Sequence, residues 1–297
     1  MSLYRGRFAP TPSGPLHLGS LVAALASFLD ARHARGHWGL RIEDVDPPRC
    51  PPGAADTIRR QLDAFGLHWD GPVIRQSDHH DAYAAALERL ATRGLAYPCS
   101  CSRKQWRDHA VYPGWCRDGV VEPHKPQAWR LRSDLGLRPV AWEDRQLGHQ
   151  AFDPATLGDV VLKRKDGLWA YQLAVVVDDA DQGINQVVRG ADLLDNTPWQ
   201  RQLQHALGLA EPRYLHLPLV LGDDGQKLSK QNRAPALPDT EPAARPLLHQ
   251  ALTLLDQAPP AELAQAPVEE QLARAIACWT PGRLRAAPGR RLTGATD

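Results

Sequence analysis

The segment from Arg7 to Ser20 constrains the fold most, because it reads as a strand, then a loop, then the start of a helix. Its middle is rich in proline and glycine, which mark loops. Apolar residues then recur with the spacing of one helical face, at Leu18, Leu21, Val22, Leu25, Phe28 and Leu29. We therefore predict a strand over residues 3–9 and a helix over residues 17–35, with Ser13 and Pro15 as its cap and first-turn proline.

The start of this helix is a candidate phosphate-binding site. Unpaired backbone N–H groups and the positive end of the helix dipole both favour an anion there. His17 adds a ring donor, and Gly19 allows a ligand to approach the backbone closely. Taken alone, this pattern is more typical of an ordinary strand-to-helix turn, so a functional interpretation needs support from elsewhere in the chain.

Strands and helices alternate through the first part of the chain. Further strands are predicted over residues 37–43 and 73–75, and helices over residues 54–65 and 78–93. This alternation implies parallel strands joined by right-handed crossovers, which is an α/β fold with a Rossmann-like sheet. Ligands on such a sheet bind beyond the carboxyl ends of the strands, where His17 and Glu43 fall.

Residues 97–170 break this pattern and are predicted to form an inserted α+β subdomain, with a hairpin at residues 165–167. Cys99, Cys101 and Cys116 fall close together within it. Three such residues could simply be small buried side chains, but thiolates are good zinc ligands and structural zinc sites take four ligands. On chemistry alone, His109 is the candidate for the fourth ligand.

The sheet is predicted to resume after the insertion. The continuous apolar run over residues 168–177 predicts a buried strand, and residues 184–189 a further strand. A helix capped at Asn196 is expected to reach Leu207, and residues 214–221 lead into a glycine-flanked loop that carries Lys227 and Lys230.

We therefore divide the chain into three parts. We expect residues 1–96 and 171–235 to form the Rossmann-like domain, residues 97–170 the inserted subdomain with the candidate zinc site, and residues 236–297 a helical C-terminal extension with helices near 244–256 and 261–278.

Composition limits the partners and the compartment. Lys and Arg number 35 against 34 Asp and Glu, a net charge of +1, so a nucleic-acid partner would need a local basic patch. Five cysteines, an odd number, fit a reducing compartment better than a disulfide scaffold. No apolar run approaches membrane-spanning length and no signal-peptide pattern begins the chain, so we expect a cytoplasmic protein without membrane contact. Separately, we expect a monomer.

Two distant motifs give the pattern at the helix start a partner. His17-Leu18-Gly19-Ser20 and Lys227-Leu228-Ser229-Lys230 together resemble the paired signatures of class I aminoacyl-tRNA synthetases. Three flanking motifs resemble the glutamyl branch of that family: Arg7-Phe8-Ala9-Pro10, Arg41-Ile42-Glu43-Asp44-Val45-Asp46 and Val187-Val188-Arg189-Gly190. The resemblance covers roughly residues 3–235, and five ordered motifs are far more specific than any one of them.

The resemblance implies a class I catalytic domain that activates glutamate with ATP to form glutamyl-adenylate. It assigns the chemistry to His17, Gly19, Lys227 and Lys230, of which His17, Gly19 and Lys230 would contact ATP, with Mg²⁺ entering as part of the ATP complex. Glu43 is the candidate partner of the substrate ammonium, Arg7 and Arg189 of its carboxylates, and Tyr171 a phenol donor. The full set implied for glutamate is Arg7, Phe8, Ala9, Pro10, Thr11, Glu43, Tyr171 and Arg189.

The resemblance also bears on the metal site. Members of the glutamyl branch with a Cys-x-Cys…Tyr-x-x-x-Cys pattern imply one zinc ion per chain, held by Cys99, Cys101, Tyr112 and Cys116. His109 or a water molecule remains the alternative to Tyr112. The expected role of the ion is to shape a loop, because none of the proposed site residues depends on it chemically.

The acceptor of the glutamate follows from a departure from the family. Ordinary glutamyl-tRNA synthetases continue into a large helical anticodon-binding domain, for which the tail of this sequence looks too short. The chain thus resembles members of the branch that esterify glutamate to queuosine in the anticodon of tRNA(Asp), which implies glutamate, ATP and that anticodon stem-loop as partners. The alternatives are charging of a tRNA 3′ end, or non-catalytic binding of tRNA or nucleotide. Intact His17, Glu43, Arg189 and Lys230 argue against the non-catalytic alternative.

Overall fold

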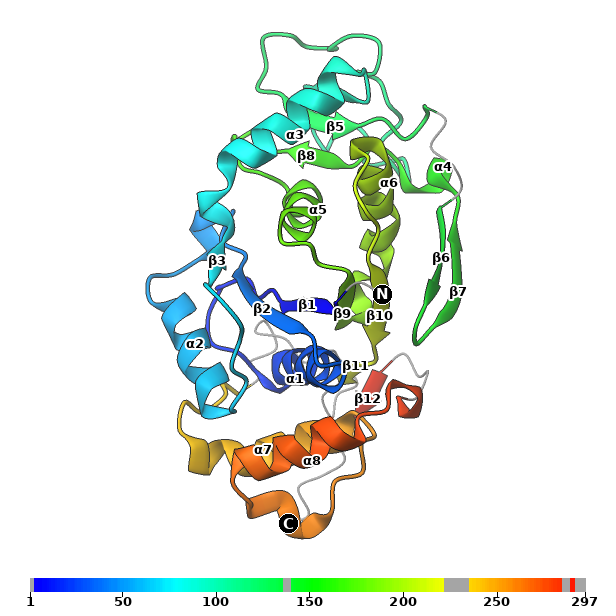
Figure 1. The fold of residues 1–297 in the computed structure, drawn as a ribbon. Coiled ribbons are helices and arrows are strands. Elements are labelled where there is room, and N and C mark those ends of the chain that lie inside the picture. The colour runs from blue at the N-terminus through cyan, green and yellow to red at the C-terminus, as the bar shows by residue number, and fades with distance from the viewer. Residues whose placement is uncertain (1–2, 136–139, 222–234, 285–288, 292–297) are drawn as a thin grey trace.

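The computed structural model describes residues 3–135, 140–221, 235–284 and 289–291 (Figure 1). Its centre is a parallel sheet in two hydrogen-bonded parts, with strand orders β1-β2-β3 and β7-β6-β10-β9. Strand β9 continues the order beside β1, since the Asn185 amide donates to the Arg5 carbonyl at 3.1 Å and the Asn185 Oδ1 accepts from the Arg5 amide at 2.9 Å. These strands are β1 (Arg5–Phe8), β2 (His37–Ile42), β3 (Ile74–Arg75), β6 (Val140–Asp144), β7 (Gly148–Phe152), β9 (Gln186–Gly190) and β10 (Arg213–Leu217).

The pairing within this sheet confirms the predicted parallel arrangement. Strand β1 runs parallel to β2 in the register Arg5↔His37 to Phe8↔Leu40, and β2 runs parallel to β3. Strand β10 is parallel to both β9 and β6, whereas β7 is an antiparallel edge strand.

Periodicity located the first helices well. They are α1 (Leu18–His33), α2 (Ala54–Ala64) and α3 (His80–Thr92), each close to its predicted range. The predicted cap of α1 was wrong, because the residue at the cap position is His17, and its side chain accepts from the Ser20 amide. Ser13 and Pro15 precede the helix and belong to the loop, where the Ser13 amide bonds the Thr11 carbonyl at 2.8 Å.

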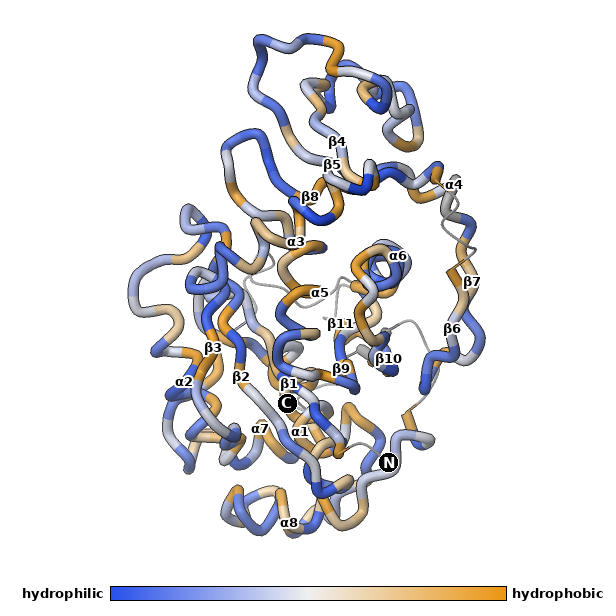
Figure 2. Tube along the Cα trace, turned by 45° about the horizontal axis from the view of Figure 1, so that its top comes forward, coloured by the Kyte–Doolittle hydropathy of each residue, from blue (hydrophilic) through white to orange (hydrophobic). Residues whose placement is uncertain are grey.

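The predicted buried strand over residues 168–177 was also wrong. Most of this run forms the helix α5 (Tyr171–Asp181), in which every residue from Gln172 to Asp179 is buried. A helix packed on all sides shows the same continuous apolar run as a central strand, so the run alone cannot separate the two. Figure 2 shows the apolar stretch of α5 and the hydrophilic residues at its C-terminal end.

The segment between β4 and α5 contributes to two sheets. An antiparallel sheet consists of β4 (Ala96–Cys99), β5 (Ala128–Leu131) and β8 (Val161–Lys163) in that order. A hairpin turn follows β8 as predicted, with the Arg164 amide bonding the Leu168 carbonyl and Gly167 at a φ of +87°. The β6–β7 hairpin instead pairs with β10 of the central sheet, and the short helix α4 (Pro154–Leu157) follows it.

Helices from the second half cover the two sides of the sheet. Helix α6 (Thr197–Leu207) packs with α3 and α5 in one apolar core, and α7 (Glu241–Leu254) and α8 (Val268–Cys278) pack against α1 in the other (Figure 1). Asn196 precedes α6 as predicted, although its side chain makes no capping bond. The predicted helix over residues 261–278 is divided into a short 3₁₀ helix, Ala261–Gln265, and α8.

Two short strands complete the described chain: β11 (Leu219–Leu221) and β12 (Gly289–Arg291) pair in parallel. Across the described ranges, every helix falls short of the length and apolarity that a bilayer crossing needs.

Candidate active site and metal centre

A cavity of about 350 Å³ lies beyond the carboxyl ends of the central strands. It is where sheet topology predicted a ligand site, because β1, β2 and β9 all end at its wall and α5 begins there. The cavity is lined by Arg7, Phe8, Ala9, Thr11, Ala23, Glu43, Arg49, Tyr171, Val188, Arg189, Gly190 and Leu193.

A buried charge network fixes one side of this cavity. Arg7 donates to Asp179 of α5 through two nitrogens, at 2.9 and 3.2 Å, and Arg41 donates to the same carboxylate at 2.8 Å. Although burial acts to raise it, the two guanidinium groups hold the pKa of Asp179 below its usual value. A bidentate pair of this kind fixes the orientation of Arg7 as well as neutralising part of its charge.

Glu43 is the acidic group on this wall. Its backbone amide bonds the Pro10 carbonyl at 3.0 Å, which joins the end of β2 to the loop after β1. Burial raises the pKa of Glu43 to about 7, against the opposing effect of Arg41 and Arg7. The carboxylate is therefore poised to gain from a cation that enters the cavity, such as an ammonium group.

Arg189 lies on the same lining and comes from β9. Its Nε donates to His216 Nε2 at 3.2 Å, its Nη2 donates to Thr197 Oγ1 at 2.8 Å, and its guanidinium lies 5.2 Å from the ring centre of Tyr214. On the same lining, burial raises the pKa of Tyr171, so its hydroxyl stays protonated and able to donate.

A second cavity of about 260 Å³ adjoins the first, and Phe8, Thr11, Ala23 and Gly190 line both. It contains the start of α1, with Pro10, His17 and Gly19 on its lining. His17 Nδ1 accepts from the Ser20 amide at 3.4 Å, which leaves the ring hydrogen on Nε2.

The loop before α1 is also held by a side chain of α2. Gln61 of α2 accepts from the Leu16 amide at 2.8 Å and donates to the Leu237 carbonyl at 2.7 Å. The predicted lysines of this site, Lys227 and Lys230, lie outside the described residues.

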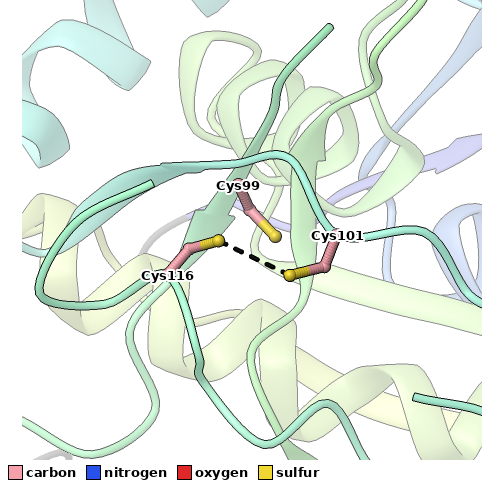
Figure 3. A group of neighbouring side chains, drawn as sticks. All are labelled: Cys99, Cys101 and Cys116. Carbon is pink, nitrogen blue, oxygen red and sulfur yellow. Dashed lines mark hydrogen bonds between the residues drawn. The ribbon is translucent and has the colours of Figure 1, made fainter. Parts of the chain in front are cut away.

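The three predicted zinc-ligating cysteines meet at the end of β4 (Figure 3). The sulfur atoms of Cys99, Cys101 and Cys116 all lie within 4.8 Å of one another and are buried, with 3.5 Å between those of Cys101 and Cys116. Zinc–thiolate bonds of about 2.3 Å in a tetrahedron place the sulfur atoms about 3.8 Å apart, so small shifts of these side chains would let them hold the ion. Although burial acts to raise it, hydrogen bonds from Val121, Tyr112 and Ser100 lower the pKa of Cys116 to about 6.

Tyr112 lies nearer to this group than the alternative ligand does. Its hydroxyl oxygen is 3.3 Å from the sulfur of Cys99 and 3.5 Å from that of Cys101, as a fourth vertex would be. His109 is exposed, and its ring lies edge-on to Trp115 at 5.5 Å between centroids. The arrangement favours Tyr112 over His109.

The site residues that were predicted from sequence and are described by the structure thus gather in two adjoining cavities and in one cluster of cysteines with Tyr112. Sequence reasoning missed the residues that hold them. Asp179, Thr197, His216 and Asp144 stand in no recognisable motif, and Arg41 was part of a motif without being given a role. Only the pairing of distant elements brings these groups together.

The sequence matches the family described as tRNA synthetases class I (E and Q), catalytic domain, over residues 4–111 and 117–241. It is 55% identical over 281 residues to the Glutamyl-Q tRNA(Asp) synthetase of Pseudomonas fluorescens, covering 94% of this chain and 92% of that protein. It is 54% identical to the enzyme of that name from Pseudomonas aeruginosa, over 95% of this chain and 96% of that protein. It is likewise 54% identical to that from Thiobacillus denitrificans, over 92% of each.

The fold is similar to that of a solved glutamate tRNA ligase from Elizabethkingia meningosepticum, crystallised with its amino acid. The TM-score is 0.81 at 26% identity, and the match covers 98% of this chain and 67% of that one. On these similarities the chain belongs to the class I glutamyl and glutaminyl tRNA synthetases and, within them, to the family of the glutamyl-Q tRNA(Asp) synthetases.

Proposed function

We propose that the chain activates L-glutamate with ATP and transfers the glutamyl group to queuosine in the anticodon of tRNA(Asp). Relatives that share more than half of their residues with this chain, over nearly their whole length, carry the name Glutamyl-Q tRNA(Asp) synthetase. The observation that carries the proposal is the pair of adjoining cavities, one lined by charged groups that suit an amino acid and one containing a helix start that suits phosphate.

The first cavity supports a specific pose for glutamate. Glu43 would pair with the ammonium, and Arg7 and Arg189, which face the same space, would each take a carboxylate. Arg7 already shares its charge with Asp179, whereas Arg189 is held by the neutral groups His216 and Thr197. We therefore assign the side-chain carboxylate, the group that distinguishes glutamate from glutamine, to Arg189.

Catalysis in this arrangement needs alignment and charge neutralisation rather than a protein nucleophile. The α-carboxylate of glutamate attacks the α-phosphorus of ATP, giving glutamyl-adenylate and pyrophosphate. A hydroxyl of the queuosine diol then attacks the acyl carbon and AMP leaves. His17 Nε2 and the amides at the start of α1 would bind the phosphates, Mg²⁺ would accompany ATP, and Lys227 and Lys230 would stabilise the leaving pyrophosphate.

Zinc would serve the subdomain as a structural ion. Cys99, Cys101, Tyr112 and Cys116 would hold it, joining the end of β4 to the loop that follows. None of these four residues lines either cavity, so the ion would organise this loop rather than enter the reaction. We place the reaction in the cytoplasm and expect the enzyme to act as a monomer.

Activation is tested by glutamate-dependent ATP–pyrophosphate exchange without tRNA. We expect exchange, because residues of this one chain line both cavities around the ends of the same sheet. Exchange that begins only when tRNA is added would overturn the preformed site.

The acceptor is tested with radioactive glutamate. Proteins usually read RNA through splayed single-stranded bases, so an anticodon loop is a suitable substrate. We expect labelling of an isolated tRNA(Asp) anticodon stem-loop that carries queuosine, and none of the same RNA with guanosine at that position. Removing the 3′ terminus from whole tRNA should leave labelling intact, and loss of labelling on that truncation would identify a synthetase that charges the 3′ end.

A further inference from the structure

Three buried side chains, those of Asp144, His216 and Arg189, form a hydrogen-bonded triad across the strands behind the first cavity, the one proposed for glutamate. Arg189 on β9 and His216 on β10 lie directly opposite each other in the parallel register, and Asp144 ends the next strand, β6. His216 Nδ1 is 2.5 Å from Asp144 Oδ2, and His216 Nε2 is 3.2 Å from Arg189 Nε. The exposed fractions of Arg189, His216 and Asp144 are 5%, 0% and 3%, so water does not replace these contacts.

The hydrogen bonds in this triad have a fixed direction. Asp144 Oδ1 accepts from the backbone amides of Gln146 and Leu147, each at 3.0 Å, so the carboxylate is held as an acceptor. His216 must then donate from Nδ1, which leaves a lone pair on Nε2. That lone pair accepts the Nε hydrogen of Arg189, a group that can only donate.

The triad determines which part of the Arg189 guanidinium faces the cavity. One edge of the guanidinium is used by His216 and Thr197, and its face lies over Tyr214. In the part of the chain that the structure describes, the remaining nitrogen, Nη1, makes no hydrogen bond, while Arg189 lines the cavity. The guanidinium therefore presents one donor group in a fixed orientation.

We propose that Asp144 and His216 are positioning residues that give the site its preference for glutamate over glutamine by holding Arg189 in this orientation. The inference rests on the proposed pairing of Arg189 with the side-chain carboxylate of the substrate. Neither residue lines the cavity itself, so both act through Arg189. A guanidinium free to turn would lose the carboxylate and could meet a glutamine amide almost as well.

Asp144→Asn tests the direction of the hydrogen bonds in the triad, because asparagine has nearly the same shape as aspartate. The two backbone amides hold the new side-chain oxygen at the Oδ1 position, so the amide nitrogen faces His216 Nδ1. The ring hydrogen must then move to Nε2, where it opposes the Nε hydrogen of Arg189. We expect KM for glutamate to rise about 10- to 100-fold, as for the loss of a hydrogen bond to a charged group, with KM for ATP unchanged within about twofold.

Asp159→Asn is the matched control. Asp159 is as buried as Asp144, at 3% exposure, and binds Arg117 and Ser133 away from both cavities. It should lower stability in a similar way while leaving KM for glutamate and the glutamate-to-glutamine ratio as in the wild type.

A second pair of variants covers the case in which Asp144→Asn does not fold. The side chain of His216→Gln offers an N–H toward Asp144 and an oxygen toward Arg189, whereas that of His216→Leu offers neither. The glutamine variant should retain most of the glutamate preference and the leucine variant should lose it.

Wild-type exchange with glutamate is measured first, since its absence would overturn the proposed function and this inference with it. With wild-type exchange present, an unchanged KM for glutamate in Asp144→Asn, or equal losses in His216→Gln and His216→Leu, would overturn the positioning role alone.

Discussion

The pKa of Glu43, raised by burial to about 7, determines how glutamate activation should depend on pH. Glu43 must be ionised to pair with the substrate ammonium, so the rate should follow its ionised fraction. That fraction is about 0.9 at pH 8, about 0.5 at pH 7 and about 0.1 at pH 6 for a group of this pKa. We therefore expect kcat/KM for glutamate to fall about tenfold from pH 8 to pH 6, since kcat/KM reports ionisations of the free enzyme.

The assay is ATP–pyrophosphate exchange at saturating ATP, with glutamate varied at each pH. Two variants separate Glu43 from other titrating groups. Glu43→Gln should be slow at pH 8 and lose the inflection near pH 7. Burial is the main cause of the raised pKa of Glu43, and the charge of Asp179 adds to it; in Asp179→Asn that charge is lost while Arg7 and Arg41 remain, so the inflection should move to lower pH. A flat profile in the wild type, or an inflection near pH 7 that persists in Glu43→Gln, would refute this reasoning.

Three further predictions concern the other charged groups. Arg189→Ala should lower kcat/KM for glutamate at least about 30-fold, equal to about 2 kcal/mol, and narrow its advantage over glutamine in the same assay; unchanged kinetics would exclude Arg189 from substrate binding. Metal analysis should find one zinc ion per chain, lost in Cys101→Ser and reduced in Tyr112→Phe; full content in the cysteine variant would exclude the site, and full content in the tyrosine variant alone would favour His109 or water as the fourth ligand. Buried Asp30, Asp144, Asp159 and Asp179 all have a pKa below the usual 3.8, so their contribution to the free energy of unfolding should be complete above that pH and be lost as pH drops below it; a free energy of unfolding that stays flat from about pH 4 to about pH 2 would contradict this.

Sequence periodicity predicted the elements that have one polar and one apolar face. Helices α2 and α3 each expose one side, so their buried positions, such as Ile58 and Leu62 or Tyr83 and Leu87, recur at helical spacing. Helix α5 has no exposed side over most of its length, so its sequence carries no such period. The same burial that makes α5 central to the fold is the reason its type could not be predicted.

The site was predicted to the extent that topology or a local motif fixes it. The rule that ligands bind beyond the carboxyl ends of parallel strands pointed to the edge of the sheet where the two cavities lie, with Glu43 on the lining of one and His17 on that of the other. The groups that orient Arg189 could not be found in this way, because Asp144 and His216 are separated by 72 positions and flanked by no shared pattern. Their meeting depends on β6 pairing with β10, although β6 lies within the segment 97–170 that reads as an insertion.

The end of β6 links the supports of both cavities. Asp144 binds His216, while the next residue, Arg145, binds Asp30 of α1 through two nitrogens at 2.6 and 2.8 Å. Trp279, just beyond α8, donates to the same Asp30 carboxylate at 2.9 Å. Because successive side chains leave a strand on opposite faces, one strand end can reach the Asp144–His216–Arg189 triad on one face and α1, which lines the second cavity, on the other. The residue after β6 and the one that follows α8 thus both hold α1, whose first residues line the second cavity.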